Sequence, residues 1–425
     1  MIEQYIETDK EIGRLVTQLV EKEELLNTHV LHLTANENRL SKTAREVLSS
    51  ALSFRYHLGI PADYNFDDIV AKPNLLFRGL PNLYRLEDMA HRCLNKHLGG
   101  VVSDSRPLSG LHAMICSISS LTSPGDIVLS ICPEGGGHFA TATLINQLGR
   151  KSVLIDYDRK TLALSLSHLH QLSKEYNVKA VFLDDSAPLY AMPLKEIRDI
   201  LGPDVIVIYD ASHTLGLIYG QQFLHPLQDG CDVIQANTHK TFPGPQKGLL
   251  HFADNTIAGK AMQTIGSCLV SSQHTHHSLA FYITALEMDL HAKNYADMIV
   301  ANAKLLSGAL EKNGFQVLTN GKSFTDTHQI LFNLPGHLSH YEISRKLLEC
   351  HISTNAKHVY ERDVVRIGVQ ELTRLGMRGT EMEEIAGIIK LAVLDDKKEI
   401  AVGMVNELNN AFQDVHYSFD NASML

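Results

Sequence analysis

The residue with the clearest chemical potential is a lysine, Lys240, in the segment NTHKTFPGP (237–245). It follows DVIQANT (232–238), a run typical of a buried strand, and precedes a Gly/Pro turn. A lysine so placed can form a Schiff base with an aldehyde cofactor. Only the neutral amine reacts, so the side chain needs a desolvated pocket that lowers its pKa. An isolated lysine would not carry this interpretation, and the prediction depends on the residues that accompany it.

A carboxylate and a histidine precede the lysine by about thirty residues. Asp210 ends the apolar run VIVIY (205–209), and His213 follows three residues later. At the end of a buried strand, Asp210 can keep a pyridine nitrogen of the cofactor protonated, which makes the ring an electron sink. His213 can reach a phenolic oxygen of the cofactor or the substrate. The alternative for Asp210 is a helix cap, a common role of aspartate before a helix.

Two glycine-containing segments are candidates for holding the rest of such a cofactor. Ser109 and Gly110 open a stretch compatible with a helix, and backbone amides at a helix start can bind phosphate. Gly135, Gly136 and Gly137 precede His138. The glycines allow close approach of the backbone, and His138 could lie flat on the cofactor ring. Either segment alone could be an ordinary turn or helix start.

Arg366, in the segment RIGV (366–369), is a candidate for binding a substrate carboxylate, because a guanidinium forms two parallel hydrogen bonds with it. A structural ion pair is the alternative. The histidines of HTHH (274–277) resemble a metal cluster, but no carboxylate or cysteine is arranged with them. We therefore predict no metal site.

The elements that must position these residues alternate between strand-like and helix-like runs. The expected strands cover 126–131, 152–157, 179–184, 204–210 and 232–238, and the helices between them cover 138–149, 164–175 and 193–200. This alternation predicts an α/β fold with a mainly parallel sheet whose strand ends carry the active site. A long helix over 278–312 leads into a small α+β domain. The predicted division is a helical arm over 1–60, a large domain over 61–295 and a small domain over 296–425.

Composition restricts the function further. The 425 residues are 44% hydrophobic and carry a formal net charge of −10, with no long basic run, which argues against a nucleic-acid partner. No apolar stretch approaches the ~18 residues of a membrane span. Six scattered cysteines indicate reduced thiols, and the acidic, polar start is unlike a signal peptide. We expect a cytoplasmic protein without a membrane partner. The helical stripe in residues 1–28 fits either an arm on a partner subunit or an ordinary amphipathic helix.

Taken in order, these motifs resemble the serine hydroxymethyltransferase family, and the likeness covers about residues 30–395. The resemblance implies the aspartate aminotransferase-like fold (fold type I) and pyridoxal 5'-phosphate bound to Lys240. It implies that Asp210 pairs with the pyridine nitrogen and that His138 stacks on the ring. The remaining implied contacts are phosphate at Ser109, Gly110 and His239, the phenolic oxygen near Ser186 and His213, and substrate at Asn36 and Arg366. It also implies a homodimer with shared sites, in which Tyr56 reaches the partner's site.

Three segments depart from the family pattern. Leu58 stands where the family has a catalytic glutamate, a tyrosine pair is replaced around 76–79, and a glycine-rich loop has become SSQH (271–274). A leucine cannot donate, accept or titrate. These departures put ordinary folate-dependent hydroxymethyl transfer in doubt.

The segments NTHKTFPGPQKG (237–248), FTDTHQ (324–329) and YSFDN (417–421) are closer to the threonine transaldolase branch of the family. This likeness implies that threonine loses acetaldehyde and that the remaining glycine unit adds to a second aldehyde. The predicted partners are therefore small amino acids and aldehydes. A hydroxymethyltransferase or simple aldolase is the first alternative, and a non-catalytic binding protein with the same fold is the second.

Overall fold

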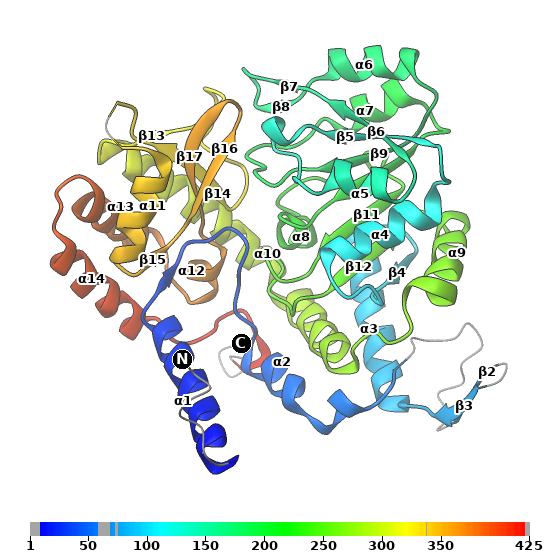
Figure 1. The fold of residues 1–425 in the computed structure, drawn as a ribbon, viewed down its shortest axis with the longest axis horizontal. Coiled ribbons are helices and arrows are strands. Elements are labelled where there is room, and N and C mark those ends of the chain that lie inside the picture. The colour runs from blue at the N-terminus through cyan, green and yellow to red at the C-terminus, as the bar shows by residue number, and fades with distance from the viewer. Residues whose placement is uncertain (1–8, 58–68, 73–74, 337, 421–425) are drawn as a thin grey trace.

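The computed structural model describes residues 9–57, 69–72, 75–336 and 338–420. The largest sheet formed by these residues has seven strands in the order β4-β12-β11-β10-β9-β5-β6 (Figure 1). All neighbouring strands are parallel except at β12, which is antiparallel to both β11 and β4. The prediction of a mainly parallel sheet is confirmed. The strands are β4 (Val102–Asp104), β5 (Ile127–Ile131), β6 (Lys151–Ile155), β9 (Val178–Asp184), β10 (Ile206–Asp210), β11 (Val233–Asn237) and β12 (Gly248–Phe252).

Helices cover both faces of this sheet. In β9, Ala180 and Phe182 pack with the helices of one face, whereas Val181 and Leu183 belong to the core on the other. Burial on both faces explains why these strands are nearly continuous apolar runs. The first face carries α4 (Gly110–Leu121), α5 (Thr141–Gln147) and α9 (Asn255–Thr264), and the second carries α6 (Leu166–Glu175), α7 (Leu194–Leu201) and α8 (Leu215–Tyr219).

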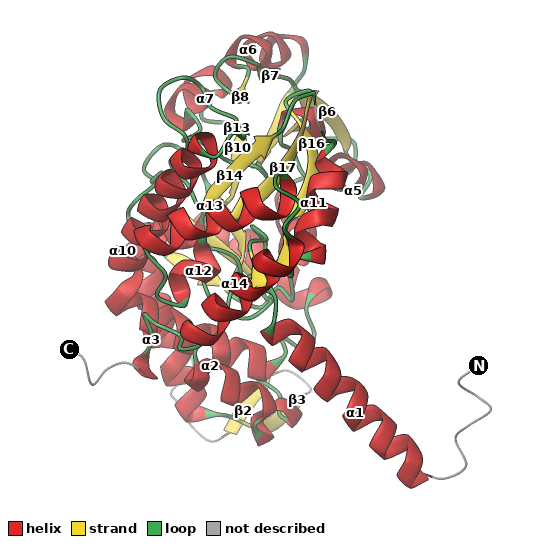
Figure 2. Cartoon of the chain, turned by 90° about the vertical axis from the view of Figure 1, so that its left-hand side faces the viewer, coloured by secondary structure: helices red, strands yellow, loops and turns green. Residues whose placement is uncertain are grey.

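A second, antiparallel sheet has the order β13-β14-β17-β16. Its strands are β13 (Gln316–Val317), β14 (Gln329–Asn333), β16 (Asn355–Val359) and β17 (Arg362–Gly368). The helices beside it are α11 (His340–Glu349), α12 (Gln370–Arg374), α13 (Gly379–Val393) and α14 (Lys398–Ala411), seen in front of the sheet in Figure 2. β16 is an edge strand, and in Figure 1 it lies on the side of the small sheet that faces the large one.

The two parts are joined by α10 (Thr275–Lys312), which continues without a break through the predicted boundary at 295/296. The N-terminal segment is tied to the small part, because β1 (Leu31–His32) pairs with β15 (Ile352–Ser353). The division at residues 60 and 295 stays a prediction.

The amino-terminal helix α1 (Asp9–Thr28) projects away from the rest of the chain (Figure 2). Its apolar side chains are exposed, among them Val16, Leu19 and Leu26 at 56%, 57% and 61%. No helix within the described ranges is long and apolar enough to cross a membrane. The other elements are α2 (Lys42–Glu46), β2 (Ile69–Lys72), β3 (Leu75–Arg78), α3 (Pro81–Leu98), β7 (Tyr157–Asp158), β8 (Ala163–Leu164) and short turns of helix at 47–49, 51–54, 133–135 and 265–269.

Candidate active site

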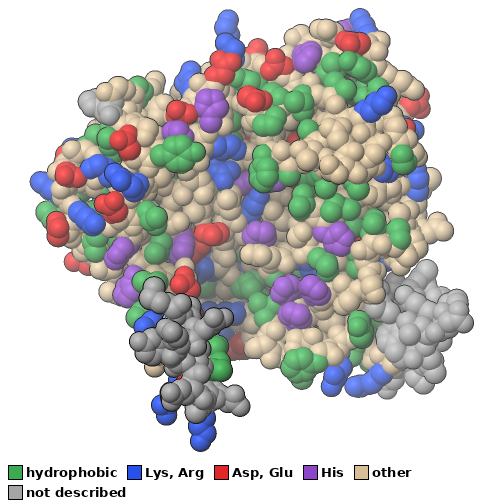
Figure 3. Space-filling view, viewed as in Figure 1, with side chains coloured by type: hydrophobic (Ala, Val, Ile, Leu, Met, Phe, Trp, Pro, Cys, Tyr) green, Lys and Arg blue, Asp and Glu red, His purple; other side chains and the backbone are tan. Residues whose placement is uncertain are grey.

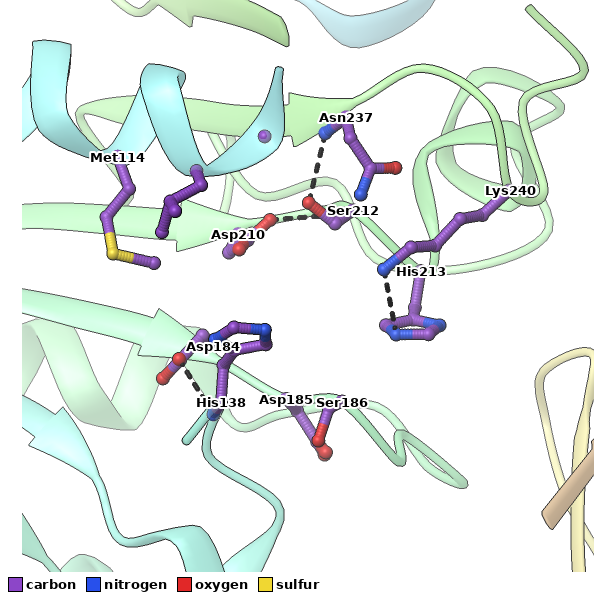
Figure 4. A pocket seen from close by; sticks show the side chains of 12 residues that line it. Met114, His138, Asp184, Asp185, Ser186, Asp210, Ser212, His213, Asn237 and Lys240 are labelled. Atoms are coloured by element: carbon purple, nitrogen blue, oxygen red, sulfur yellow. Dashed lines mark hydrogen bonds between the residues drawn. The ribbon is translucent and has the colours of Figure 1, made fainter. Parts of the chain in front are cut away.

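A pocket lies where the carboxyl ends of β9, β10 and β11 meet the start of α4 (Figure 4). This is the edge at which parallel sheets place their ligands. Figure 3 shows lysine, arginine and histidine side chains gathered along the groove between the two parts of the molecule. The pocket is lined by Gly110, Leu111, Met114, His138, Asp184, Asp185, Ser186, Asp210, Ser212, His213, Asn237 and Lys240.

Lys240 extends into this pocket from the loop after β11. Its Nζ lies 3.0 Å from Nε2 of His213, and its carbonyl oxygen accepts a hydrogen bond from Asn38 at 2.6 Å. Burial lowers the pKa of Lys240 to about 8. At pH 8 about half of such a side chain is neutral, against about 0.3% for an ordinary lysine. The predicted nucleophilic amine is therefore available under mild conditions.

His213 is held by a second set of contacts from the small part. The side-chain amide of Gln329 donates to Nδ1 at 2.9 Å, so Nε2 carries the proton and faces Lys240. The ring stacks on His328, with centroids 5.7 Å apart. Burial lowers the pKa of His213 well below its usual value. A neutral imidazole fixed in one tautomer can donate to an oxygen or nitrogen in the pocket without adding charge.

Asp210 stands at the end of β10 and opens onto the pocket. Its Oδ1 accepts the amide of Ser212 at 2.8 Å, and burial raises the pKa of the carboxyl. No lysine, arginine or histidine of the described chain forms an ion pair with it. The N-cap position of the nearest helix, α8, is occupied by Thr214, and the side chain of Asp210 makes no capping hydrogen bond to this helix. This excludes the helix-cap alternative and leaves a carboxylate that a cationic ring nitrogen would stabilise.

His138 is positioned by the acid that ends the neighbouring strand. Asp184 accepts the backbone amide of His138 at 2.9 Å and the hydroxyl of Thr141 at 2.5 Å. Burial raises the pKa of Asp184 to about 7. The same side chain thus fixes the loop that presents the His138 ring to the pocket.

Asp185 and Ser186, which follow Asp184, connect the His138 loop to the end of β9. Ser186 donates its hydroxyl to the carbonyl of Gly136 at 2.6 Å. Gly136 has φ +102°, and a Cβ there would lie 2.5 Å from Oδ1 of Asp185, so only glycine fits. Burial raises the pKa of Asp185 to about 6, and its Oδ1 accepts the amide of Ala187.

Of the predicted phosphate-binding residues Ser109, Gly110 and His239, only Gly110 lines the pocket. We call these three residues the phosphate seat. Ser109 caps α4 by accepting the amide of His112 at 3.1 Å, and Gly110 packs against Asn237, where a Cβ would come within 2.9 Å. His239 follows Asn237 but is not a lining residue, and burial lowers its pKa to about 4. Nδ1 of His239 and Oδ1 of Asn237 are buried without a hydrogen-bond partner among the described residues.

Arg366 reaches the edge of the site from β17. It donates to Oδ1 of Asn36 at 2.9 Å and Oδ1 of Asn355 at 3.0 Å, and also to the carbonyl of Ser186. These acceptors are neutral, and Nε has no partner in the described part of the chain. Arg366 forms no structural ion pair within the described residues, so its positive charge is available to a substrate carboxylate.

The other candidates lie apart from the pocket lining. Tyr56 is 64% exposed. A residue that reaches into the site of a partner subunit would be exposed in this way in a single subunit. His57 is buried and contacts Glu87 through Nε2 at 2.7 Å. Leu58 lies outside the described residues. The rings of His274, His276 and His277 lie near one another, but no metal-binding group of histidine, cysteine and acid side chains occurs in the described ranges.

Comparison with known proteins agrees with this geometry. The family model for serine hydroxymethyltransferase matches residues 7–389. The chain belongs to the serine hydroxymethyltransferase family. It is 31% identical to serine hydroxymethyltransferase of Methanosphaera stadtmanae over 92% of both chains. It is 35% identical to fluorothreonine transaldolase of Streptantibioticus cattleyicolor over 96% of its own length, which spans 64% of that relative.

A solved structure also matches across the whole chain. The crystal structure of L-threonine transaldolase from Pseudomonas fluorescens in its internal aldimine state superposes with a TM-score of 0.90. It is 27% identical and the match covers 97% of this chain and 95% of that one. The predicted fold type I is confirmed, and the chain is a pyridoxal-phosphate-dependent transferase.

The residues present fit that cofactor. Asp210 is a half-buried carboxyl that forms no ion pair within the described residues, and the pKa of the nearby Lys240 amine is lowered to about 8. Asn237, whose Oδ1 has no hydrogen-bond partner among the described residues, lies against Gly110 at the start of α4. When bound, pyridoxal phosphate supplies an electron sink for bonds broken at an amino acid's Cα.

Several site residues went unnoticed in the sequence. Asp184 ends the strand KAVFLD and Asp185 follows it, so the strand-end argument used for Asp210 would have found them. Gln329 and Lys357 come from the small sheet. Gln329 ends the segment FTDTHQ, which was noted only as a family likeness, and Lys357 stands in no motif. Only the approach of the two sheets brings them to the pocket.

Proposed function

We propose that this protein transfers the glycine unit of L-threonine to a second aldehyde, releasing acetaldehyde and forming a new β-hydroxy-α-amino acid. The proposal is carried by one pocket that Lys240, with its pKa lowered to about 8, and Asp210 both line, and by Arg366 beside it, which has no ion-pair partner among the described residues. The likeness to two transaldolases over nearly the whole chain supports the choice of threonine.

In this proposal each side chain has a stated task. Arg366 holds the substrate carboxylate and so fixes the direction of the Cα–Cβ bond. Lys240 binds the cofactor through its amine, and His213 donates from Nε2 into the pocket. Asp210 keeps the cofactor's ring nitrogen protonated, and Asp184 holds the loop that carries His138. Ser109, Gly110 and His239 bind the phosphate.

Folate-dependent serine hydroxymethyl transfer is the second candidate, favoured by the match of the family model to residues 7–389. Leu58 argues against it, because an apolar side chain cannot exchange protons with a hydroxyl group or with folate. The test is to incubate the enzyme with L-threonine and a panel of aromatic and sugar-derived aldehydes, and separately with serine and tetrahydrofolate. We expect amino-acid products with aldehydes and slow folate chemistry. A fast folate reaction with no aldehyde product would assign hydroxymethyl transfer instead.

The Arg366→Ala variant is expected to raise the KM for threonine by about a hundredfold or more. The carboxylate loses a charge-assisted contact of about 1.5–3 kcal/mol per hydrogen bond, whereas the phosphate seat is unchanged. Titrations with amino acid and with cofactor measure the two affinities separately. Equal losses in both would mean that Arg366 supports the small sheet and does not bind substrate.

We further propose a cytoplasmic homodimer in which Tyr56 completes the partner's site. The exposed apolar face of α1 and the exposure of Tyr56 support the dimer, and the six free cysteines, four of them buried, support a reducing compartment. Light scattering should give twice the chain mass of 47.2 kDa. Mixing inactive Lys240→Ala and Tyr56→Phe chains should restore activity in hybrid dimers. A monomer that is fully active would contradict the shared site.

A further inference from the structure

Lys357 is a lysine of the small sheet that does not line the pocket itself but contacts Ser186, which does. In the pairing of β16 with β17, Asn355 lies opposite Arg366, and Lys357 is two residues further along β16. Residues two apart share one face of a strand, so Lys357 lies on the face that carries Asn355 and Arg366. Its Nζ donates a hydrogen bond to Oγ of Ser186, a residue that lines the pocket.

The strand that carries Lys357 is anchored to the large part. The amide of Tyr360 donates to the carbonyl of Glu134 at 2.7 Å, and the rings of Tyr360 and Tyr157 contact each other. These contacts hold the end of β16 against the loop that precedes His138. Lys357 is therefore placed at the pocket by both sheets.

Its surroundings lower the pKa of the amine, although Asp185 and Asp184 act in the opposite direction. Within the described residues no carboxylate lies at ion-pair distance from Lys357, and the guanidinium of Arg366 donates to the same Ser186 residue. Burial, with Arg366 next, lowers the pKa of Lys357 to about 8. The charged and titratable groups that act on it or share its pocket are Asp184, Asp185, His138, His213, Lys240 and Arg366.

We propose that Lys357 is a catalytic residue that takes the proton of the substrate's β-hydroxyl and returns it to the alkoxide of the product. This inference rests on the proposed function. In cleavage, the O–H bond breaks and an N–H bond forms at Nζ. The oxygen's electron pair then forms the C=O bond of acetaldehyde, and the pair of the Cα–Cβ bond stays on Cα. In the addition step, the electron pair on Cα attacks the carbonyl carbon of the second aldehyde. The aldehyde oxygen then takes the proton from Nζ.

The other titratable groups near the pocket are held by contacts of their own, although Oδ1 of Asp184 is buried without a hydrogen-bond partner among the described residues. Asp184 accepts from His138 and Thr141, and Asp185 accepts from Ala187. His213 lies between Lys240 and Gln329. A neutral Lys357 keeps a lone pair after donating to Ser186. When the substrate carboxylate binds Arg366 and neutralises its charge, Lys357 becomes a stronger base, at the stage at which the hydroxyl must lose its proton.

The first experiment compares two reactions of the holoenzyme. Threonine cleavage needs the hydroxyl proton removed, whereas exchange of the glycine α-hydrogen with deuterated water does not. We expect Lys357→Gln to slow acetaldehyde release by about 10²–10⁴-fold and to leave glycine exchange within a few-fold of wild type. Lys357→Arg should be equally slow, because an arginine does not give up its proton. His358→Gln, an exposed neighbour on the same strand, is the control and should retain both rates.

Three outcomes would overturn the proposal. The first is normal threonine cleavage by Lys357→Gln. The second is a loss of glycine exchange in Lys357→Gln as large as the loss of threonine cleavage, and the third is an active Lys357→Arg. The last would show that only a positive charge is needed, as for an anionic group on the acceptor. If threonine is cleaved in a Lys357-dependent way but no aldehyde is condensed, the proposed function fails and the role of Lys357 stands.

A second readout needs no turnover. Competitive acetylation of the cofactor-free protein with acetic anhydride over a range of pH, followed by mass spectrometry of the Lys357 peptide, reports the pKa of this amine. We expect a titration near 8. A titration near the ordinary lysine value of about 10.4 would contradict the proposal, because the amine would be charged at working pH.

Discussion

Replacing Lys240 with alanine is expected to abolish turnover, with a loss of at least about a thousandfold, while the protein stays folded. The side chain lies at the pocket, and its Nζ contacts only His213 in the described structure. Its removal therefore leaves the core intact. A thousandfold loss corresponds to about 4 kcal/mol of barrier. Circular dichroism and thermal unfolding check the fold.

The same variant tests where the cofactor is attached. Wild-type protein should be yellow with pyridoxal phosphate, and reduction with borohydride should fix the cofactor on the peptide that contains Lys240. Lys247, a second buried lysine with a pKa of about 7, donates to the carbonyl of Gln273 and provides an internal control. Modification of Lys247 in place of Lys240, or a colourless wild type, would refute the assignment of the site.

The Asp210→Asn variant is expected to lose the reaction by several orders of magnitude. Asparagine keeps an oxygen that accepts the amide of Ser212, so the local turn is preserved. It carries no negative charge and cannot keep the ring nitrogen protonated, so the electron sink is weakened. Each factor of ten is about 1.4 kcal/mol of barrier. Single-turnover rates with threonine measure the effect directly.

Asp184 provides the matched comparison for this variant. It is also a strand-end aspartate, but it is fully buried and accepts from His138 and Thr141. We expect Asp184→Asn to weaken the position of His138 and to retain a cofactor with normal protonation, visible in its absorbance. If Asp210→Asn is nearly as active as wild type, Asp210 is a structural turn residue and the assignment of the electron sink is wrong.

The sequence was sufficient for the five parallel strands of the large sheet, β5, β6, β9, β10 and β11, and for residues at their ends. Strands buried on both faces are continuous apolar runs, and a polar residue that ends such a run must lie at the sheet's edge, which located Asp210 and Lys240. The long helix was expected over 278–312 and covers Thr275–Lys312. The antiparallel strand β12 was not foreseen, because a strand's direction depends on its neighbours and not on its own residues.

The contribution of the small sheet could not be predicted in the same way. Gln329 reaches His213 across 116 positions of the chain, and Lys357 reaches Ser186 across 171. Such contacts depend on how the two sheets pack, and neither residue stands in a motif with a chemical signature. Arg366 was a candidate because a guanidinium suits a carboxylate, but its segment alone could not distinguish this role from a structural ion pair. The pairing of His57 with Glu87 likewise needs the path of α3.

The central claim is that one glycine unit passes from threonine to an aldehyde without being released. Its most direct test is a reaction with threonine labelled with ¹³C at all carbons, an unlabelled aromatic aldehyde and an excess of unlabelled glycine, without folate. We expect C1 and C2 of the product to be fully labelled and labelled acetaldehyde to appear in equal amount. A product diluted by unlabelled glycine, or acetaldehyde with labelled glycine and no new amino acid, would contradict it.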